Sequence, residues 1–216
     1  MHDLSFRSLS EEQLAAFQTA QHGNNCTLHA ISAALDLLCG VRLPPAELIR
    51  QTDRLWWHGH FFRLAPGWAV PPLMQARLVN YLATSYSLPV RARKFHLSPE
   101  ILHGLAGDGS LLALVTLYWL PGHAPAIYYG RDANNLNATG GMGAHTMLFA
   151  AYDPSHFNAA GSPSPWGFVN SWVEQGSSLY WMTDRDFKRG WGFPIPWLAN
   201  HAAVIISKTT EEVTEI

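Results

Sequence analysis

The spacing of apolar residues changes near residue 88 of this 216-residue chain. Before that point apolar residues recur at helical spacing, most regularly over residues 26–39. After it, short apolar runs typical of strands alternate with loops rich in Gly and Asn. The change predicts an α+β fold in which a helical lobe of about residues 1–88 precedes an antiparallel β lobe of about residues 89–210, with residues 1–216 forming one domain.

The expected elements follow from these periods and from their start and stop signals. Helices are expected over residues 8–17, 26–39, 44–57, 73–86 and 98–105. Strands are expected over residues 89–95, 111–120, 145–152, 166–172, 178–182 and 202–207. Gly40 ends the most regular of the helices, at the position where a left-handed residue commonly closes one.

Composition and charge exclude several classes of protein. Hydrophobic residues make up 48% of the chain, enough to form a core, so disorder is excluded as the main state. The net charge of −2 gives no electrostatic footprint for nucleic acid or an anionic membrane. The longest apolar run, residues 111–120, is shorter than the ~18 residues that span a bilayer. We therefore expect neither nucleic acid nor membrane as a partner; the sequence leaves the oligomeric state open.

The compartment is predicted from the cysteines and the N-terminus. The chain has two cysteines, fewer than a disulfide framework of this length uses, which favours free thiols in a reducing compartment. The first residues, MHDLSFRSLSEEQ, lack a basic region followed by an apolar stretch, so no secretory signal is visible. These features predict a cytoplasmic protein, with secretion by a route that needs no signal peptide left open.

Cys26 is the strongest candidate for chemistry. It begins the expected helix 26–39, where unpaired backbone N–H groups and the positive end of the helix dipole favour the reactive thiolate. The polar residues before it, QHGNN, would keep the sulfur accessible. The alternative is a small buried hydrophobe, which is what a cysteine usually is. Cys39 lies roughly 20 Å along the same helix and is expected to be structural.

A thiol nucleophile needs a base, and the base needs a partner that orients it. His145 is the candidate base, because it begins the expected strand 145–152 directly after a glycine-rich segment. Asn170, in the apolar stretch GFVNSW, could accept the proton on one ring nitrogen and so select the tautomer. Trp172 could cover that hydrogen bond and exclude water. Two of these residues also have an ordinary interpretation: His145 as a loop histidine, and Asn170 as a strand-edge asparagine.

Taken together and in this order, the three motifs resemble the papain-like cysteine peptidases. The resemblance rests on Cys26 at the head of a helix, on HTMLFAAYD from His145 to Asp153, and on VNSW around Asn170. The start QHGNNCTLHA is more similar to bacterial bacteriocin-leader peptidases than to plant papain, and it lacks the Gly-Ser-Cys-Trp context of true papains. The resemblance implies a papain-like two-lobe fold, a Cys26–His145–Asn170 triad shielded by Trp172, and no cofactor.

The resemblance also implies an oxyanion-hole glutamine just before the cysteine. Gln21 is favoured, because its side-chain amide and the Cys26 backbone N–H could face one point; Gln18 is the reserve. The expected activity is hydrolysis of peptide, isopeptide or related amide bonds in a peptide or protein substrate, through an acyl-enzyme. An acyltransferase or deamidase on the same triad, and a catalytically silent binding module, stay open as alternatives.

Other segments give weaker hypotheses. Trp56 and Trp57, with Gly143 and Ala144 on the opposite side, are candidates for a substrate groove, although core packing is the more usual role of aromatic residues. The His58-Gly59-His60 pair lacks further ligands at metal-binding spacing, so no metal site is expected. Residues 134–144, rich in Gly and Asn, are expected to form a mobile loop that controls access to the sulfur.

Overall fold

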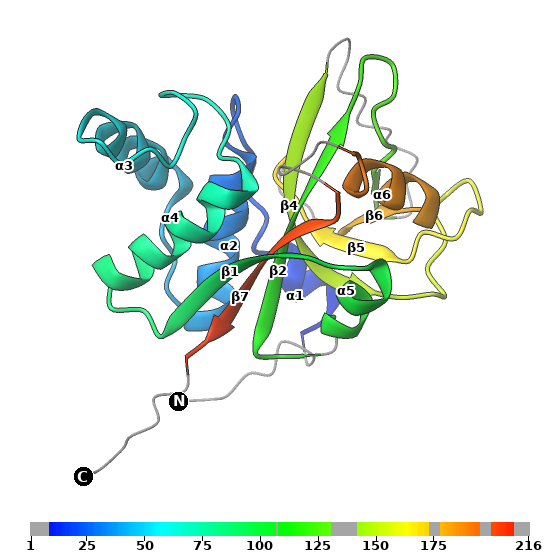
Figure 1. The fold of residues 1–216 in the computed structure, drawn as a ribbon. Coiled ribbons are helices and arrows are strands. Elements are labelled where there is room, and N and C mark those ends of the chain that lie inside the picture. The colour runs from blue at the N-terminus through cyan, green and yellow to red at the C-terminus, as the bar shows by residue number, and fades with distance from the viewer. Residues whose placement is uncertain (1–8, 107, 131–141, 173–177, 195–199, 210–216) are drawn as a thin grey trace.

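One antiparallel sheet organises the chain (Figure 1). The computed structural model describes residues 9–106, 108–130, 142–172, 178–194 and 200–209. Within these ranges seven strands pair in the order β1-β7-β2-β4-β5-β6-β3. The strands are β1 (Val90–His96), β2 (Leu111–Trp119), β3 (Tyr128–Tyr129), β4 (Gly143–Tyr152), β5 (Trp166–Val169), β6 (Tyr180–Met182) and β7 (Ala202–Lys208).

Helices cover both faces of this sheet. Figure 1 shows α2 (Cys26–Cys39), α3 (Pro45–Trp57) and α4 (Pro72–Ser85) on one side, with α5 (Pro99–Leu105) and α6 (Asp184–Trp191) on the other. The short α1 (Glu11–Ala15) begins at Ser10, whose side chain forms a capping box with Gln13. None of the helices in the described part of the chain combines the length and the apolar character that a bilayer span requires.

The core has two layers because side chains along a strand alternate between the faces of the sheet. On β2, Leu112 and Leu114 join the apolar cluster that packs against α2 and α4. The intervening Ala113 and Val115 join the cluster on the opposite face, which includes Phe187 of α6. A central strand buried on both faces reads as a nearly continuous apolar run, as residues 111–120 do.

The expected helices and strands are all present, with shifted ends. The most regular helix starts at Cys26 and is closed by Gly40 in the left-handed conformation. The expected strand 166–172 is shorter than predicted: pairing ends at Val169, so Asn170 lies just beyond the strand rather than within it. Residues 134–141 of the expected mobile loop lie outside the described residues.

Two elements were not predicted. β3 has only two residues and pairs with β6, so it carries no period that a sequence pattern could reveal. α6 is strongly polar and buries little besides Phe187, Gly190 and Trp191. Its start has a recognisable signal, because the Thr183 side chain accepts a hydrogen bond from the Asp186 amide.

Candidate active site

Cys26 is the first residue of α2, and the fold brings it against β4. Its side chain is buried, and the residue is 7% exposed. The backbone N–H of Thr146 donates a hydrogen bond to Cys26 Sγ over 3.4 Å. Because Thr146 directly follows His145, this contact joins the start of the helix to the strand that carries the histidine.

His145 and Asn170 meet through their side chains. The distance between His145 Nε2 and Asn170 Oδ1 is 2.6 Å, and both residues are almost completely buried. The Ser171 amide also donates to Asn170 Oδ1, over 2.6 Å, which identifies this atom as the acceptor. The proton of the imidazole therefore lies on Nε2, so Nδ1 remains as the basic nitrogen.

Trp172 packs on this pair. Its ring centroid lies 4.0 Å from that of His145, with the ring planes inclined by 35°. An indole in this position covers the imidazole and limits the access of water to the hydrogen bond below it. The structure thus places Trp172 beside His145, where the sequence analysis expected a shield.

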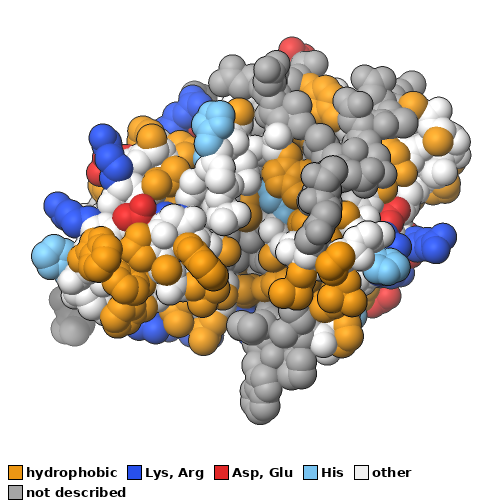
Figure 2. All heavy atoms as spheres, turned by 90° about the horizontal axis from the view of Figure 1, so that it is seen from above, with side chains coloured by type: hydrophobic (Ala, Val, Ile, Leu, Met, Phe, Trp, Pro, Cys, Tyr) orange, Lys and Arg blue, Asp and Glu red, His pale blue; other side chains and the backbone are white. Residues whose placement is uncertain are grey.

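Cys26 and His145 both line one cleft of about 560 Å³. Helical segments and their connections contribute one wall, formed by Gln21, Asn24, Cys26, Trp68 and Ala69. The sheet side contributes Trp119, Met142, Gly143, Ala144, His145 and Trp172. Figure 2, a view from above relative to Figure 1, shows hydrophobic side chains gathered along the lower part of this face.

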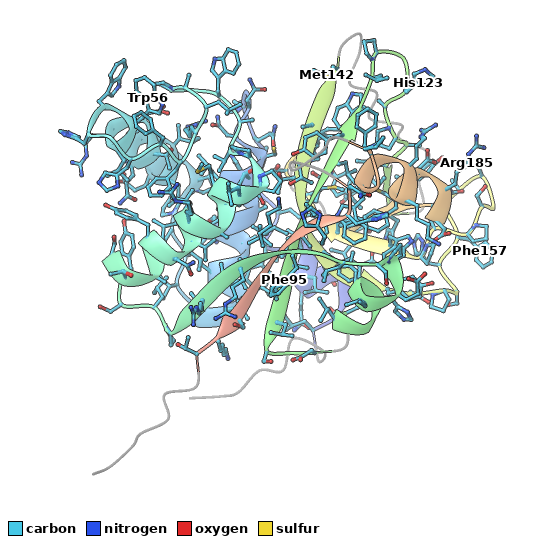
Figure 3. The ribbon with its side chains drawn as sticks, in the orientation of Figure 1. Trp56, Phe95, His123, Met142, Phe157 and Arg185 are labelled. Carbon is cyan, nitrogen blue, oxygen red and sulfur yellow. The ribbon has the colours of Figure 1, made fainter. Side chains whose placement is uncertain are left out.

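The wall of the cleft differs in part from the sequence prediction. Gly143 and Ala144 do line it, but its described lining does not include Trp56 or Trp57, so their assignment to this groove is corrected. Trp57 is 72% exposed and packs edge-to-face on Trp56. Figure 3 shows Trp56 on α3, away from the end of the sheet where Met142 lies.

Two tryptophans that the sequence analysis missed, Trp68 and Trp119, belong to the cleft. A Cβ added at Gly143 would lie 2.2 Å from the Trp119 ring, so only glycine permits this close approach. Trp68 precedes Ala69 in the connection between α3 and α4. A tryptophan in an irregular connection has no periodic signal, so only the tertiary structure could reveal it.

The two glutamines take different places. Gln21 lines the cleft; its Nε2 donates to the Gly23 carbonyl over 3.0 Å, and its Oε1 accepts from the Ser171 hydroxyl over 2.6 Å. The amide carries two N–H groups, and the second has no acceptor among the residues that the structure describes. Gln18 is buried instead beside Asn170, whose backbone N–H donates to its Oε1. The geometry therefore favours Gln21 over Gln18 as a donor within the cleft.

Burial shifts the protonation of both reactive groups towards neutrality. Burial raises the pKa of the Cys26 thiol, while hydrogen bonds from the backbone of Thr146 and Thr27 oppose the rise. Burial lowers the pKa of His145 to about 3, although the hydrogen bond that its ring donates to Asn170 acts in the opposite direction. These directions favour a thiol beside a neutral imidazole. Burial thus opposes the effect of the helix N-terminus, which by itself favours the thiolate.

Within the ranges that the structure describes, no three side chains of His, Cys, Asp or Glu lie close enough together to hold an ion. His58 and His60 lie beyond the end of α3, where the ring of His60 packs on Tyr81 and Phe62.

The comparisons with known proteins concern the fold. No protein-family model matches the chain, and no curated protein matches it in sequence. Among solved structures, the chain is similar to a Bacillus anthracis protein provisionally described as a C39-like peptidase, with a TM-score of 0.54 and 13% sequence identity. The match covers 90% of this chain and 96% of that one. At this identity the likeness concerns the fold alone.

Proposed function

We propose that the protein is a papain-like cysteine peptidase that cleaves peptide or related amide bonds through an acyl-enzyme. One observation carries the proposal: Cys26 and an Asn170-oriented His145 line the same cleft. The name of the Bacillus anthracis neighbour supports a peptide or protein substrate. The proposal treats residues 1–216 as one domain of two lobes, helical and β, with the reaction at their junction.

In the proposed mechanism His145 is the general base. As Cys26 Sγ attacks the substrate carbonyl carbon, the thiol proton moves to Nδ1 of His145, and Asn170 stabilises the resulting imidazolium at Nε2. The neutral resting forms suit this order of events. The thiol still carries its proton when it attacks, and the neutral imidazole is able to accept that proton. The backbone contact from Thr146 stabilises negative charge on the sulfur.

The same side chains would complete the reaction. The carbonyl oxygen, negative in the tetrahedral intermediate, would accept hydrogen bonds from the Cys26 N–H and the free N–H of Gln21. Collapse breaks the C–N bond, the His145 imidazolium gives its proton to the leaving amine, and the acyl group stays on sulfur as a thioester. Water, deprotonated by His145, then attacks the thioester and releases the acid and the thiol.

The test uses an electrophilic thiol probe followed by mass spectrometry at several pH values. Cys26 should be labelled faster than Cys39, and His145→Ala should slow labelling of Cys26 while leaving Cys39 unchanged. Incubation with a peptide pool should then yield cleaved products with the wild type and none with Cys26→Ser. Equal labelling of the two cysteines would reject the proposed nucleophile. Reactive Cys26 without cleavage, but with transfer to an added amine, would point to an acyltransferase instead.

A further inference from the structure

Arg63 is a buried cation close to the candidate nucleophile. Its side chain is 0% exposed, although a guanidinium is costly to remove from water. It lies in the connection between α3 and α4, a few residues before the cleft-lining Trp68. The role proposed above for Cys26 does not use Arg63, so its burial calls for a separate explanation.

The guanidinium donates to four groups from three segments. Nε donates to the Trp68 carbonyl over 2.8 Å. Nη1 donates to Asp53 Oδ1 over 3.0 Å and to Thr52 Oγ1 over 3.3 Å, both on α3. Nη2 donates to Asn25 Oδ1 over 2.5 Å. Asp53 is the single carboxylate among these partners, so most of the hydrogen bonds serve to hold neutral groups in place.

The bond to Asn25 changes how α2 begins. Asn25 occupies the N-cap position, where an asparagine side chain ordinarily accepts a hydrogen bond from the second or third amide of the helix. Here it makes no such bond. Its Oδ1 accepts from Arg63 instead, and its Nδ2 donates to the His22 carbonyl over 2.6 Å.

The second amide of α2, that of Thr27, is thereby left for another partner. The Leu28 and His29 amides donate to the Asn25 carbonyl. Among the described residues, no carbonyl or side-chain oxygen accepts from the amides of Cys26 and Thr27. The Thr27 amide acts on the sulfur, where it opposes the burial-driven rise of the Cys26 pKa. An Asn25 side chain that capped the helix would compete for this same donor.

We propose that Arg63 is a positioning residue that holds the Asn25 side chain away from the N-terminus of α2, so that the Thr27 amide stays free for the thiolate. This inference rests on the proposed function, because it assigns Arg63 to the support of the same nucleophile. The bond to the Trp68 carbonyl lets the same side chain fix one wall of the cleft relative to the helix.

The test measures the rate of Cys26 alkylation by iodoacetamide against pH, which needs no knowledge of the substrate. In Arg63→Met the released Asn25 should cap α2, and the midpoint of the profile should rise by about one pH unit, or about tenfold in rate at neutral pH. Replacing Asn25 by Ala in the same variant removes the competing oxygen and should restore most of the rate. Arg50→Met is the matched control, because Arg50 is exposed and its ion pair in the described part of the chain is with Glu47 of the same helix.

Other titratable groups near Cys26 stay unchanged in all these variants. They are His145 on β4, which lines the same cleft, and Tyr118 on β2, whose pKa of about 12 reflects burial and, to a smaller extent, the charge of Cys26. A shifted profile therefore reports a change at the helix N-terminus or the loss of the guanidinium charge. Arg63→Lys separates these two causes, because lysine keeps a cation near Asp53 but lacks the planar fork that also reaches Asn25.

The outcomes decide between positioning, charge and structure. We expect Arg63→Lys to react as slowly as Arg63→Met and to recover with Asn25→Ala; this variant also serves if Arg63→Met fails to fold. A wild-type profile in Arg63→Lys, or a slow profile that Asn25→Ala leaves unchanged, would overturn the proposal. Wild-type Cys26 that reacts no faster than Cys39 would instead reject the proposed function, so the two failures are distinguishable.

Discussion

Replacing His145 by Gln should make the free energy of unfolding fall less steeply as the pH is lowered from 7 to 5. Burial lowers the pKa of His145 to about 3 in the folded protein, whereas an unfolded histidine titrates near 6.5. Between these values the unfolded chain binds one proton more than the folded protein at this site. Stability from His145 is therefore complete above about pH 6.5 and is lost as the pH falls towards 3.

The magnitude follows from the proton difference. One proton corresponds to ~1.4 kcal/mol per pH unit, so the free energy of unfolding should fall by about 2 kcal/mol between pH 7 and pH 5 through this residue alone. The slope over this range depends little on the folded pKa, provided that it stays well below 5. Gln removes the titrating group but keeps a side-chain amide that can donate to Asn170 Oδ1.

Urea unfolding at pH 7, 6 and 5 measures the effect for wild type and variant. Burial also lowers the pKa of His29 and His201, so only the difference between the two proteins isolates His145. His123→Gln is the matched control, because His123 is exposed, and it should keep the wild-type slope. Parallel curves for wild type and His145→Gln would show that His145 is protonated in the folded protein at pH 5. The buried neutral imidazole of the proposed mechanism would then be refuted.

Three further predictions concern the surroundings of the site. Gln21→Ala should lower kcat for peptide cleavage by roughly 100-fold with little change in KM, and an unchanged kcat would remove Gln21 from the oxyanion hole. Asn170→Leu should leave the His145 Nε2–H buried without an acceptor, which costs about 1–3 kcal/mol in urea unfolding and slows alkylation of Cys26; a wild-type alkylation rate would refute the orienting role. Gly143→Ala should force the Trp119 ring to move, lowering the free energy of unfolding by about 1–3 kcal/mol; an unchanged value would mean that the ring moves without cost.

The order of helices and strands could be predicted because it depends on local signals. The start of α2 at Cys26 follows from a polar loop that gives way to apolar residues at helical spacing, and its end follows from Gly40. The antiparallel strands follow from short apolar runs with turn residues between them. The motif around Asn170 also indicated a partner for His145, because the carbonyl oxygen of a buried amide needs a hydrogen-bond donor.

The electrostatics and the cleft walls could not be predicted in this way. Local sequence placed Cys26 at a helix N-terminus, which favours thiolate, but its burial comes from strands more than a hundred residues away. Trp68 and Trp119 come to line the same cleft only in the folded chain, whereas Trp57, which looked suitable in sequence, lies exposed on α3. The sequence shows that a residue is aromatic, but only the tertiary structure shows whether it lines the cleft, packs in the core or lies exposed.

A buried polar cluster explains how two short motifs so far apart are kept in register. Thr27 and Thr146 directly follow the cysteine and the histidine of the site, and their hydroxyls lie 3.0 Å apart. Gln75 of α4 donates to the Thr146 hydroxyl over 3.1 Å, and the Thr116 hydroxyl of β2 lies 3.0 Å from that of Thr146. Unpaired polar groups at this depth would be costly, so a shift of α2 along the sheet would break several hydrogen bonds together. The cluster therefore helps to hold α2 at the position in which Sγ meets the Thr146 amide.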